Sequence, residues 1–544
     1  MTRLNRARFG CAGLVALATA LGGVSAPSAW AQSDVCEAAG LPLQETVRID
    51  TLIGVDVDAP AERPYLAGDG QSVIFESEAT NIPALLPDGE ALPEGALAGG
   101  FRQIYVMDIA SGDVRIASVN DAGEPSNADC VLNEGALDHA GDVAVFECSG
   151  TNLLPGDEVD GNEADDIFAH FVNPVYGYQR GDTLRVTRAF DPSFDKTLDL
   201  GGEDANGSPQ NGAEVASIAP FAPIVVFSST ARNMVGFDLG EPFPGVPNVQ
   251  NYTFNLDTGV MELISVNDDG AVAPVMFTAA IDGDGDFVVS PSPSTNLREC
   301  DELPQAFQQR CENATPTTSI YSFDLNTQDA EDVSTARFNL PQRRVGLFCT
   351  PLFEIFLGFP SPFCGSLSPD LSYDGRYVVF DSTTPNFPDR ARDFNRTVDV
   401  YAYDFLTDEF MLVSRVPGTN KAPSDFEGIE FFTAFSDGPE IAGDGRWVIY
   451  RSSARELTGG ETGFGFFLAD LTDLNAVPET VSVPPTGGEP FSKRAGTSFE
   501  NDMPNLSAGG EIAAFSIALL KDDPAEGEPA PSTRDVPGYL RCLR

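Results

Sequence analysis

The stretch LSYDGRYVVFDSTTPN, from Leu371 to Asn386, decides the fold because the chain repeats it with little change. IAGDGRWVIYRSSARE (Ile441 to Glu456) and LAGDGQSVIFESEATN (Leu66 to Asn81) keep its order of apolar run, tight turn and second apolar run. Such self-similarity is typical of repeat architectures, in which each copy is one supersecondary unit. The copies therefore have to be counted before any residue is considered for chemistry.

The repeat is counted on the aromatic residue of its second apolar run. This marker position occurs seven times, as Phe75, Phe146, Phe227, Ser290, Phe380, Tyr450 and Phe515. Its spacing varies from 63 residues, between Phe227 and Ser290, to 90 residues, between Ser290 and Phe380. Minimal β-strand repeats of this kind need roughly 40 to 50 residues. Insertions should therefore enlarge the loops.

Each copy predicts four short strands. A turn dipeptide with glycine second precedes most markers, as in Asp374-Gly375, whereas the third copy has Ala222-Pro223. Such pairs suit two-residue hairpin turns, which need positive φ. Third strands end in aspartates that should fold the next turn, namely Asp108, Asp324, Asp404 and Asp470. Asparagines after the second strand are expected to cap it; they are Asn81, Asn152, Asn233, Asn296 and Asn386.

A four-stranded sheet cannot bury both of its faces alone, so such units stack around an axis. We predict an all-β, seven-bladed β-propeller of four-stranded antiparallel blades in one domain, 32–544. The last copy lacks a fourth strand, which the N-terminal segment at about 45–52 should supply. The predicted blades cover about 61–123, 131–190, 212–270, 276–336, 368–418, 438–486 and 503–544.

The phrase DGRYVVF, the aspartate after the third strand and the ring count resemble the TolB-like bacterial propellers, a WD-like β-propeller repeat family. The resemblance covers nearly the whole chain, from Glu45 to Arg544. It implies a propeller fold. Propellers of this kind serve as protein-interaction scaffolds, as ligand-binding domains and occasionally as enzymes.

The first 31 residues match a secretory signal peptide, with Arg3, Arg6 and Arg8 before an apolar run and a small-residue site. No later apolar run is long enough to span a membrane, so we expect a secreted or periplasmic protein. Eight cysteines then remain, and an even number in an exported chain indicates disulfides. The predicted pairs are Cys36 with Cys542, Cys130 with Cys148, Cys300 with Cys311, and Cys349 with Cys364.

The chain is strongly acidic, with a formal charge of -50 from 32 Lys and Arg against 82 Asp and Glu. Phosphate binding depends on clustered Lys and Arg, so nucleic acid is excluded as a partner. So many carboxylates indicate either cation binding or a solvated surface that keeps the protein soluble.

Two loops before third strands have a pattern suited to calcium. DGNEADDIFA (160–169) and DFNRTVDVYA (393–402) both fit D-x-N-x-x-x-D. Short oxygen side chains two residues apart can converge on one hard cation, although the alternative is an Asx-rich turn without metal. The candidate calcium ligands are Asp160, Asn162, Asp166, Asp393, Asn395 and Asp399.

Two connectors, 346–364 and 426–435, are rich in phenylalanine and should emerge on one face from neighbouring blades. They could form a platform for a partner or pack on each other and plug the channel. The residues concerned are Phe348, Phe353, Phe356, Phe359, Phe363, Phe431, Phe432 and Phe435.

Signals for nucleophilic catalysis are weak. The two histidines, His139 and His170, fall at strand and hairpin positions that favour packing, and no G-x-S-x-G elbow is present. We therefore expect a non-catalytic binding scaffold for a protein or an extracellular polymer, with calcium as a possible stabilising cofactor. The alternative is a propeller hydrolase or lyase that acts on an extracellular polysaccharide or peptide through carboxylates at the channel mouth. Convergent buried carboxylates with raised pKa would favour the enzyme.

Overall fold

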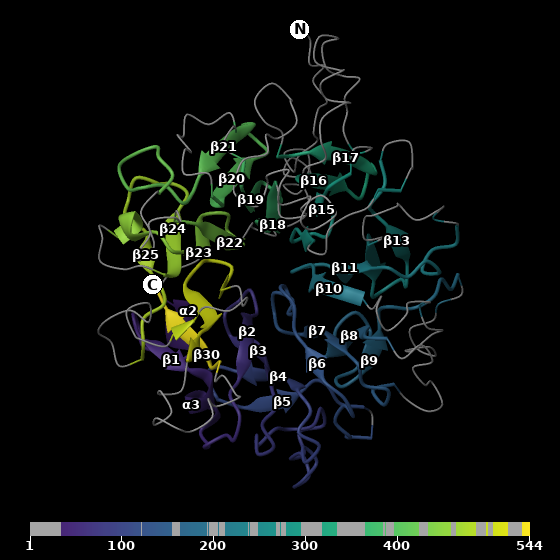
Figure 1. The fold of residues 1–544 in the computed structure, drawn as a ribbon. Coiled ribbons are helices and arrows are strands. Elements are labelled where there is room, and N and C mark those ends of the chain that lie inside the picture. The colour runs from purple at the N-terminus through teal and green to yellow at the C-terminus, as the bar shows by residue number, and fades with distance from the viewer. Residues whose placement is uncertain are drawn as a thin grey trace, which may run out of the picture.

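The structure is a computed structural model. It describes residues 34–120, 122–154, 164–192, 194, 205, 213–237, 239, 249–267, 272–273, 279–294, 297, 318–334, 365–384, 387, 397–423, 434–458, 464–485, 497–498, 504–519 and 536–544. In these residues the strands form seven four-stranded sheets, arranged as blades around an axis (Figure 1). All neighbouring strands within a blade are antiparallel. The predicted seven-bladed β-propeller is confirmed.

In each blade the first strand lies nearest the axis and the fourth lies at the rim (Figure 1). Blade 1 consists of β2(Glu62–Leu66), β3(Ser72–Ser77), β4(Gln103–Asp108) and β5(Val114–Ile116). Blade 2 consists of β6(Cys130–Val131), β7(Val143–Cys148), β8(Asp166–Phe171) and β9(Thr183–Arg185). Blade 3 consists of β10(Ala213–Ile218), β11(Ile224–Ser229), β12(Gln250–Asn255) and β13(Met261–Leu263). Blade 4 consists of β14(Ala280–Ile281), β15(Phe287–Ser292), β16(Ser319–Asp324) and β17(Asp329–Asp332).

The remaining blades follow the same order. Blade 5 consists of β18(Ser366–Leu371), β19(Tyr377–Ser382), β20(Asp399–Asp404) and β21(Glu409–Leu412). Blade 6 consists of β22(Ser436–Ile441), β23(Trp447–Ser452), β24(Gly465–Asp470) and β25(Glu479–Thr480). Blade 7 consists of β27(Asn505–Leu506), β28(Ile512–Ser516), β30(Gly538–Cys542) and β1(Thr46–Arg48). A separate strand pair joins β26(Thr497–Ser498) to β29(Ala518–Leu519), and the short helices are α2(Asp34–Ala38), α3(Ile49–Ile53) and the 3-10 helix η4(Arg455–Thr458).

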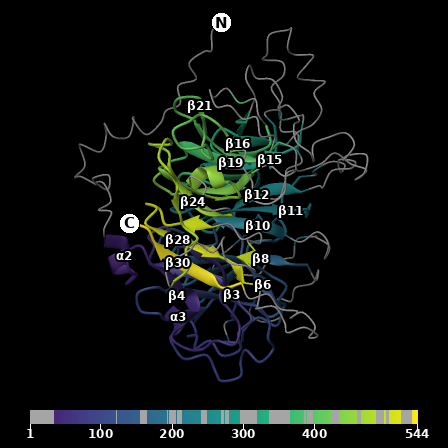
Figure 2. The same cartoon turned by 60° about the vertical axis from the view of Figure 1, so that its left-hand side comes forward.

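The two ends of the chain close the ring, as the sequence predicts. β1 pairs with β30, placing Val47 opposite Leu540. A disulfide joins Cys36 to Cys542, whose Cα atoms are 5.8 Å apart, and α2 lies beside the C-terminus in both views (Figures 1 and 2). Removing a native disulfide typically costs about 2 to 5 kcal/mol, so this bond contributes appreciably to the folded state.

The marker aromatic explains why the chain repeats one phrase. It is buried on the second strand and lies directly opposite a buried aromatic on the third strand. The ring centroids are 5.4 Å apart for Phe75 and Tyr105 and 6.1 Å apart for Phe380 and Tyr401. Blade 4 has Ser290 in this place, opposite Tyr321. The phrase thus encodes one cross-strand pair per blade, the contact that stabilises a sheet.

The glycine of each Asp-Gly-type turn has the positive φ that the hairpin needs, 64° at Gly375 and 73° at Gly445. Beside these turns, in the described residues, one backbone hydrogen bond crosses every blade boundary. Each bond joins a backbone N–H group of one blade to a carbonyl of a neighbouring blade. The donors are Ala508, Asp69, His139, Phe221, Gly283, Tyr373 and Asp444; the acceptors, in the same order, are Gly68, His139, Pro220, Gly283, Tyr373, Gly443 and Ala508. These seven bonds form a closed belt at the turn end of the channel.

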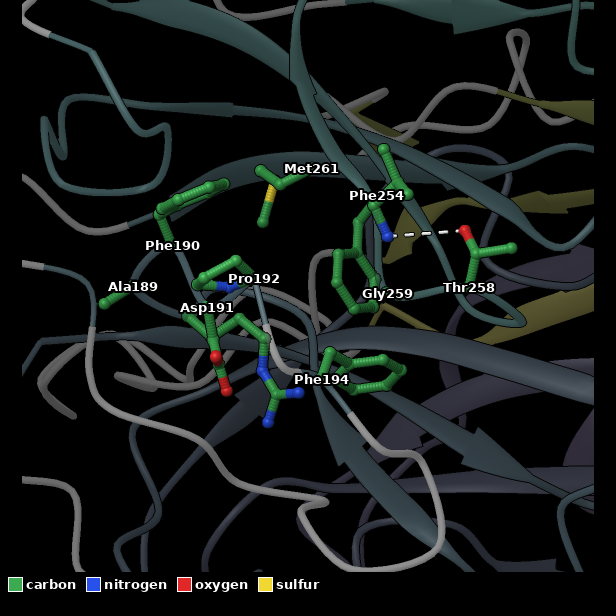
Figure 3. A pocket seen from close by; sticks show the side chains of 11 residues that line it. Ala189, Phe190, Asp191, Pro192, Phe194, Phe254, Thr258, Gly259 and Met261 are labelled. Carbon is green, nitrogen blue, oxygen red and sulfur yellow. Dashed lines mark hydrogen bonds between the residues drawn. The ribbon is translucent and has the colours of Figure 1, made fainter.

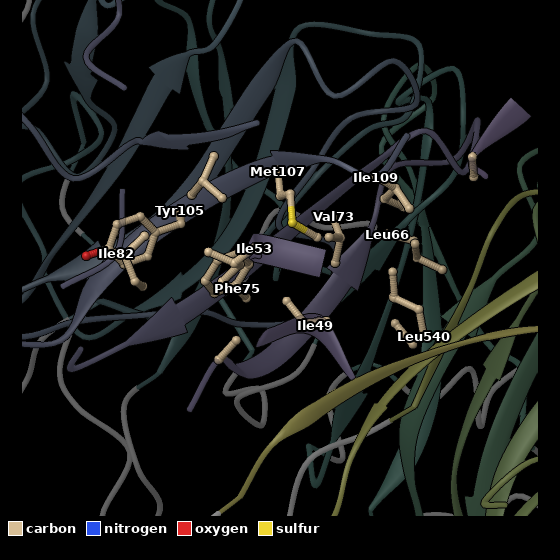
Figure 4. Packing of buried hydrophobic residues seen from close by; sticks show 14 of the residues in the cluster. Ile49, Ile53, Leu66, Val73, Phe75, Ile82, Tyr105, Met107, Ile109 and Leu540 are labelled. Atoms are coloured by element: carbon tan, nitrogen blue, oxygen red, sulfur yellow. The ribbon is translucent and has the colours of Figure 1, made fainter. Parts of the chain in front are cut away.

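The hydrophobic core lies between blades rather than within one. Around the closure, α3 contributes Ile49 and Ile53, which lie beside Phe75 of β3, while Leu540 comes from β30 (Figure 4). All of these side chains are buried. Among the described residues, no helix is both long and apolar enough to cross a bilayer.

Candidate functional site

The inner strands of blades 5 and 6 each carry a β-bulge that contains a proline and is followed by an acidic residue. Pairing shifts register between Leu367 and Asp370 in blade 5 and between Asp437 and Glu440 in blade 6. Bulges bend a strand and re-aim its side chains, and they accommodate the proline that cannot donate to the ladder. The sequences SPDLSYDGR and GPEIAGDGR therefore place Asp370 and Glu440 at equivalent points of two neighbouring inner strands.

Four carboxyl groups influence one another around the axis: Glu134 after β6, Asp370 on β18, Asp381 on β19 and Glu440 on β22. Burial, followed by the charges of Asp370 and Asp381, raises the pKa of Glu134 to about 7. Burial likewise raises the pKa of Asp370 to about 6. We call these four residues the axial carboxylates.

The other two axial carboxylates are shifted in the same direction. Burial, and then the charge of Asp437, raises the pKa of Asp381 to about 7. Burial, and then Asp370 and Glu134, raises the pKa of Glu440 well above its usual value. Like charges that share a site with little water cannot all ionise at neutral pH. The cluster therefore holds protons near pH 7 unless a cation neutralises it.

Hydrogen bonds divide the axial carboxylates into two kinds. Asp370 accepts a hydrogen bond from the Ile441 N–H at 2.8 Å, and Asp381 accepts one from the Gly438 N–H at 3.2 Å. These two side chains thus tie blade 5 to blade 6. In the described part of the chain, the carboxylates of Glu134 and Glu440 have no such partner, and both side chains are only partly exposed.

Among the described residues, one basic side chain acts on the axial carboxylates, and it is already paired. Arg451 of β23 lowers the pKa of Asp381 slightly against the other effects. Its guanidinium donates two hydrogen bonds to Asp437, at 2.8 and 2.7 Å. Because Asp437 balances this cation, the net charge at the channel remains negative when the axial carboxylates ionise.

The turn end of the channel is plugged by side chains from three blades. The rings of His139, Phe221 and Tyr373 have centroids 4.8 to 5.9 Å apart. A Cβ built on Gly68 would overlap both the Tyr373 hydroxyl and the His139 ring, so Tyr373 reaches across the axis from blade 5 to blade 1. Burial lowers the pKa of His139. This end is therefore sealed by neutral rings inside the hydrogen-bonded belt.

The second histidine also has a packing role, as the sequence predicts. His170 on β8 is buried, and its Nδ1 lies 2.9 Å from the Thr183 hydroxyl. Burial lowers its pKa to about 4. It is therefore neutral at physiological pH.

The two calcium loops lie largely outside the described residues, which exclude Asp160, Asn162, Asp393 and Asn395. Asp166 and Asp399 are described, and each begins a third strand. Asp166 accepts a hydrogen bond from Thr187 at 2.6 Å, and Asp399 accepts one from Ser414 at 3.0 Å. Gln103 accepts the equivalent bond from Ser118 in blade 1.

The carboxylates of Asp166 and Asp399 thus have a structural partner within the blade. Asp166 also forms a buried ion pair with Arg185 at 3.3 Å. In the described ranges no group of three or more His, Cys, Asp or Glu side chains could hold a metal ion. Calcium binding at the two loops stays a prediction.

The phenylalanine connectors also fall mainly outside the described residues. Phe435 is described; it directly precedes β22, and its ring lies 5.7 Å from that of Phe464. Phe348, Phe353, Phe356, Phe359, Phe363, Phe431 and Phe432 lie outside, as do Cys300, Cys311, Cys349 and Cys364 and the predicted signal peptide. The remaining predicted disulfide, between Cys130 and Cys148, is present.

The asparagines have a different role from the expected strand cap. Asn81 accepts a hydrogen bond from the Asp58 N–H at 3.0 Å, and Asn152 accepts one from the Asn127 N–H at 2.9 Å. Both therefore tie the second loop of a blade to the connector that enters the same blade. The cap belongs to the serine that ends the second strand, because Ser77 accepts the Ala79 N–H and Ser382 accepts the Thr384 N–H.

Sequence reasoning did not identify the axial carboxylates. A usable signal exists for two of them, since Pro369-Asp370 and Pro439-Glu440 stand at the same distance before the Asp-Gly turn. Glu134 has no such signal, because glycine replaces proline at 135. Its proximity to blades 5 and 6 arises from the ring alone.

Several solved propeller structures are similar to this chain. TolB from Acinetobacter baumannii has 10% sequence identity and a TM-score of 0.34, with 81% of this chain and 77% of that chain covered. An oligogalacturonate lyase from Vibrio parahaemolyticus has 11% identity and a TM-score of 0.37, covering 87% and 81%. The β-propeller domain of the Trilobed protease from Pyrococcus furiosus has 9% identity and a TM-score of 0.40, covering 90% and 97%.

No protein-family model matches the sequence, and no curated protein matches it. The structural similarities concern the propeller architecture, and the activities of those proteins are not transferred to this chain.

Proposed function

We propose that this protein is a non-catalytic binding scaffold whose channel receives a cationic group, such as a lysine or arginine side chain, from a protein partner. The observation that carries the proposal is the pair Glu134 and Glu440, whose carboxylates lack hydrogen bonds in the described residues and whose pKa values are raised by burial and by neighbouring carboxylates. A cation would allow the cluster to ionise, which is the electrostatic complementarity that specific interfaces use.

The partner would enter from the face opposite the plug. Each inner strand runs toward its turn from the end opposite the plug, so Gly365 and Phe435, which directly precede Ser366 and Ser436, lie at that end. The phenylalanine connectors 346–364 and 426–435 lead directly into these two strands. They would supply the apolar contacts around a central charged anchor, an arrangement typical of binding hot spots.

Export and calcium stabilisation belong to the same proposal. The two buried disulfides suit an oxidising compartment such as the periplasm or the extracellular space. Calcium at the loops beginning at 160 and 393 would stabilise the connections between the second and third strands of blades 2 and 5.

A cationic peptide tests the proposal directly. Short peptides that carry one lysine would be titrated into the full chain by calorimetry, with acetyl-lysine versions as neutral probes. We expect the lysine peptides to bind, and Glu440→Gln with Glu134→Gln to weaken binding about tenfold or more, because each change removes a charged partner. Glu409→Gln, at the exposed rim of blade 5, is the matched control and should change nothing.

Two results would contradict the scaffold proposal. One is equal binding of lysine and acetyl-lysine peptides, because the charge would then be irrelevant. The other is unchanged capture of partners from the native secretome after deletion of 349–364, because the proposed contact face would then be dispensable.

A second candidate is a propeller hydrolase or lyase that acts on an extracellular polysaccharide or peptide. The observation in its favour is the same cluster, because carboxyl groups with pKa values near 7 can act as general acids. Product formation from a panel of polysaccharides and peptides, lost in Glu440→Gln and kept in Glu409→Gln, would support the enzyme over the scaffold.

A further inference from the structure

A cavity lies far from the axis, between the connector that follows blade 2 and the outer hairpin of blade 3. It has a volume of about 160 Å³. Figure 3 shows the rings of Phe190, Phe194 and Phe254 and the Met261 thioether around one space, with Asp191 at its edge. The connector is fixed above blade 3 because the Phe190 N–H donates to the Asn233 carbonyl at 2.8 Å.

The inner wall of this cavity is aromatic and preformed. Phe254 of β12 is fully buried, and its ring meets that of Phe194 edge to face with centroids 5.9 Å apart. Gly259 makes this arrangement possible, since a Cβ there would overlap the Phe194 ring. Phe190 stands at the rim with 49% of its surface exposed. An exposed ring beside a built apolar wall offers a stacking surface to a ligand.

One edge of the cavity, beside the Phe194 ring, is polar. The buried Arg188 guanidinium lies over the Phe194 ring at 4.9 Å, and the Asp191 carboxylate also lines the space. A guanidinium has five N–H donors and a carboxylate about four acceptor sites. Both groups can therefore bond to a ligand in addition to their partners within the protein.

The size and the two kinds of wall define the occupant. A cavity of about 150 Å³ holds a single six-membered ring, so this cavity suits one ring and no more. A pyranose presents C–H groups on one face and hydroxyl groups around its edge. The aromatic wall fits the C–H face, while paired donors and acceptors of balanced charge fit neutral hydroxyls. We propose that this cavity binds one neutral pyranose residue of a saccharide, and we name it the blade 3 sugar site.

Saccharide binding would be measured with the full chain by saturation-transfer NMR. The probes are methyl glucoside, methyl galactoside and methyl mannoside at millimolar concentration, with benzyl alcohol as an aromatic probe without a sugar edge. We expect at least one glycoside to receive saturation, mainly at its ring C–H protons. Phe190→Ala and Asp191→Asn should each lower its affinity about tenfold, the cost of losing a stacking face or a charged hydrogen-bond acceptor.

Phe101→Ala is the matched control, because Phe101 in blade 1 is exposed to a similar extent, at 42%. It should leave glycoside binding unchanged, and circular dichroism would show that all variants are folded. Glu440→Gln should also leave it unchanged, which separates this site from the channel. The proposal is overturned if no glycoside receives saturation, if Phe190→Ala binds as well as the wild type, or if benzyl alcohol binds while the glycosides do not.

Discussion

Arg376 and Arg446 show what the Asp-Gly-Arg phrase does at the scale of single residues. Arg376 donates two hydrogen bonds to Asp404, at 3.1 and 2.7 Å, and lies over the Tyr377 ring at 4.6 Å. Arg446 makes the same bidentate contact with Asp470. The arginine therefore ties the first turn of a blade to the end of its third strand. Its role is to hold the blade together, since bidentate pairs of this kind fix geometry.

The marker aromatic should carry far more stability than an exposed aromatic. Phe380→Ala is expected to lower the free energy of unfolding by about 3 to 5 kcal/mol, because it leaves a cavity between buried rings. The measurement is denaturant unfolding at equilibrium. Phe101→Ala should stay within about 0.5 kcal/mol of the wild type. Equal effects of the two changes would contradict the role given to the marker.

The axial carboxylates predict a pH dependence with a defined sign. Their pKa values are raised in the folded state, to about 6 for Asp370 and about 7 for Glu134 and Asp381. Their contribution is therefore fully present below the unfolded values, about 4, and is lost as the pH rises through 6 to 7. Thermal unfolding should show a melting temperature that falls between pH 5 and pH 8.

Two variants assign this fall to the channel. Glu440→Gln removes one of the mutually repelling carboxyls, so its melting temperature should fall less over the same range. Glu409→Gln removes an equal charge at the exposed rim and should behave like the wild type. An identical fall in all three proteins would mean that general surface charge causes the dependence, and that the axial carboxylates do not.

At the scale of elements, the repeat predicts much of the fold but little of the site. The turn glycines, the marker aromatics and the aspartates that end third strands each recur, and each has the expected local role; Asp324, for example, accepts the Asn326 N–H. Each of these features depends on residues of one or two neighbouring strands, so it recurs as a local sequence pattern and can be predicted. Glu134 and Glu440 come together only because the ring brings blades 2 and 6 to one axis. No local pattern distinguishes Glu134 among 82 acidic residues, whereas Glu440 follows a proline at the same place in the repeat as Asp370.

Calcium binding is predicted at the second loops of blades 2 and 5. If they bind calcium, adding millimolar calcium to a chelator-treated sample should raise the melting temperature, since a ligand that binds only the folded state stabilises it. A double change, Asp160→Asn with Asp393→Asn, should abolish this rise. Equal melting temperatures with and without calcium would show that these loops do not bind calcium.

At the scale of the whole molecule, closure depends on the two chain ends. β1 contributes the outer strand of blade 7, and the Arg541 guanidinium donates to the Gln44 carbonyl at 3.1 Å. The belt of seven backbone hydrogen bonds closes the ring a second time at the turn end. Each blade is therefore supported on both sides, as an architecture without free inner edges requires.

Removal of the disulfide between Cys36 and Cys542 should destabilise the whole ring. Cys36→Ser with Cys542→Ser is expected to lower the free energy of unfolding by about 2 to 5 kcal/mol. Calorimetry should still show a single cooperative unfolding transition, because the pairing of β1 with β30 and the belt of backbone hydrogen bonds remain. A loss larger than this, or a molten state, would show that the disulfide defines the fold rather than securing it.

The most direct test of the closed seven-bladed ring is the mapping of disulfides by mass spectrometry of unreduced peptides from the folded protein. The closed ring predicts a peptide containing Cys36 linked to one containing Cys542, and a second link is expected between Cys130 and Cys148. Cys36 free, or linked to any cysteine other than Cys542, would contradict the closure on which the channel depends.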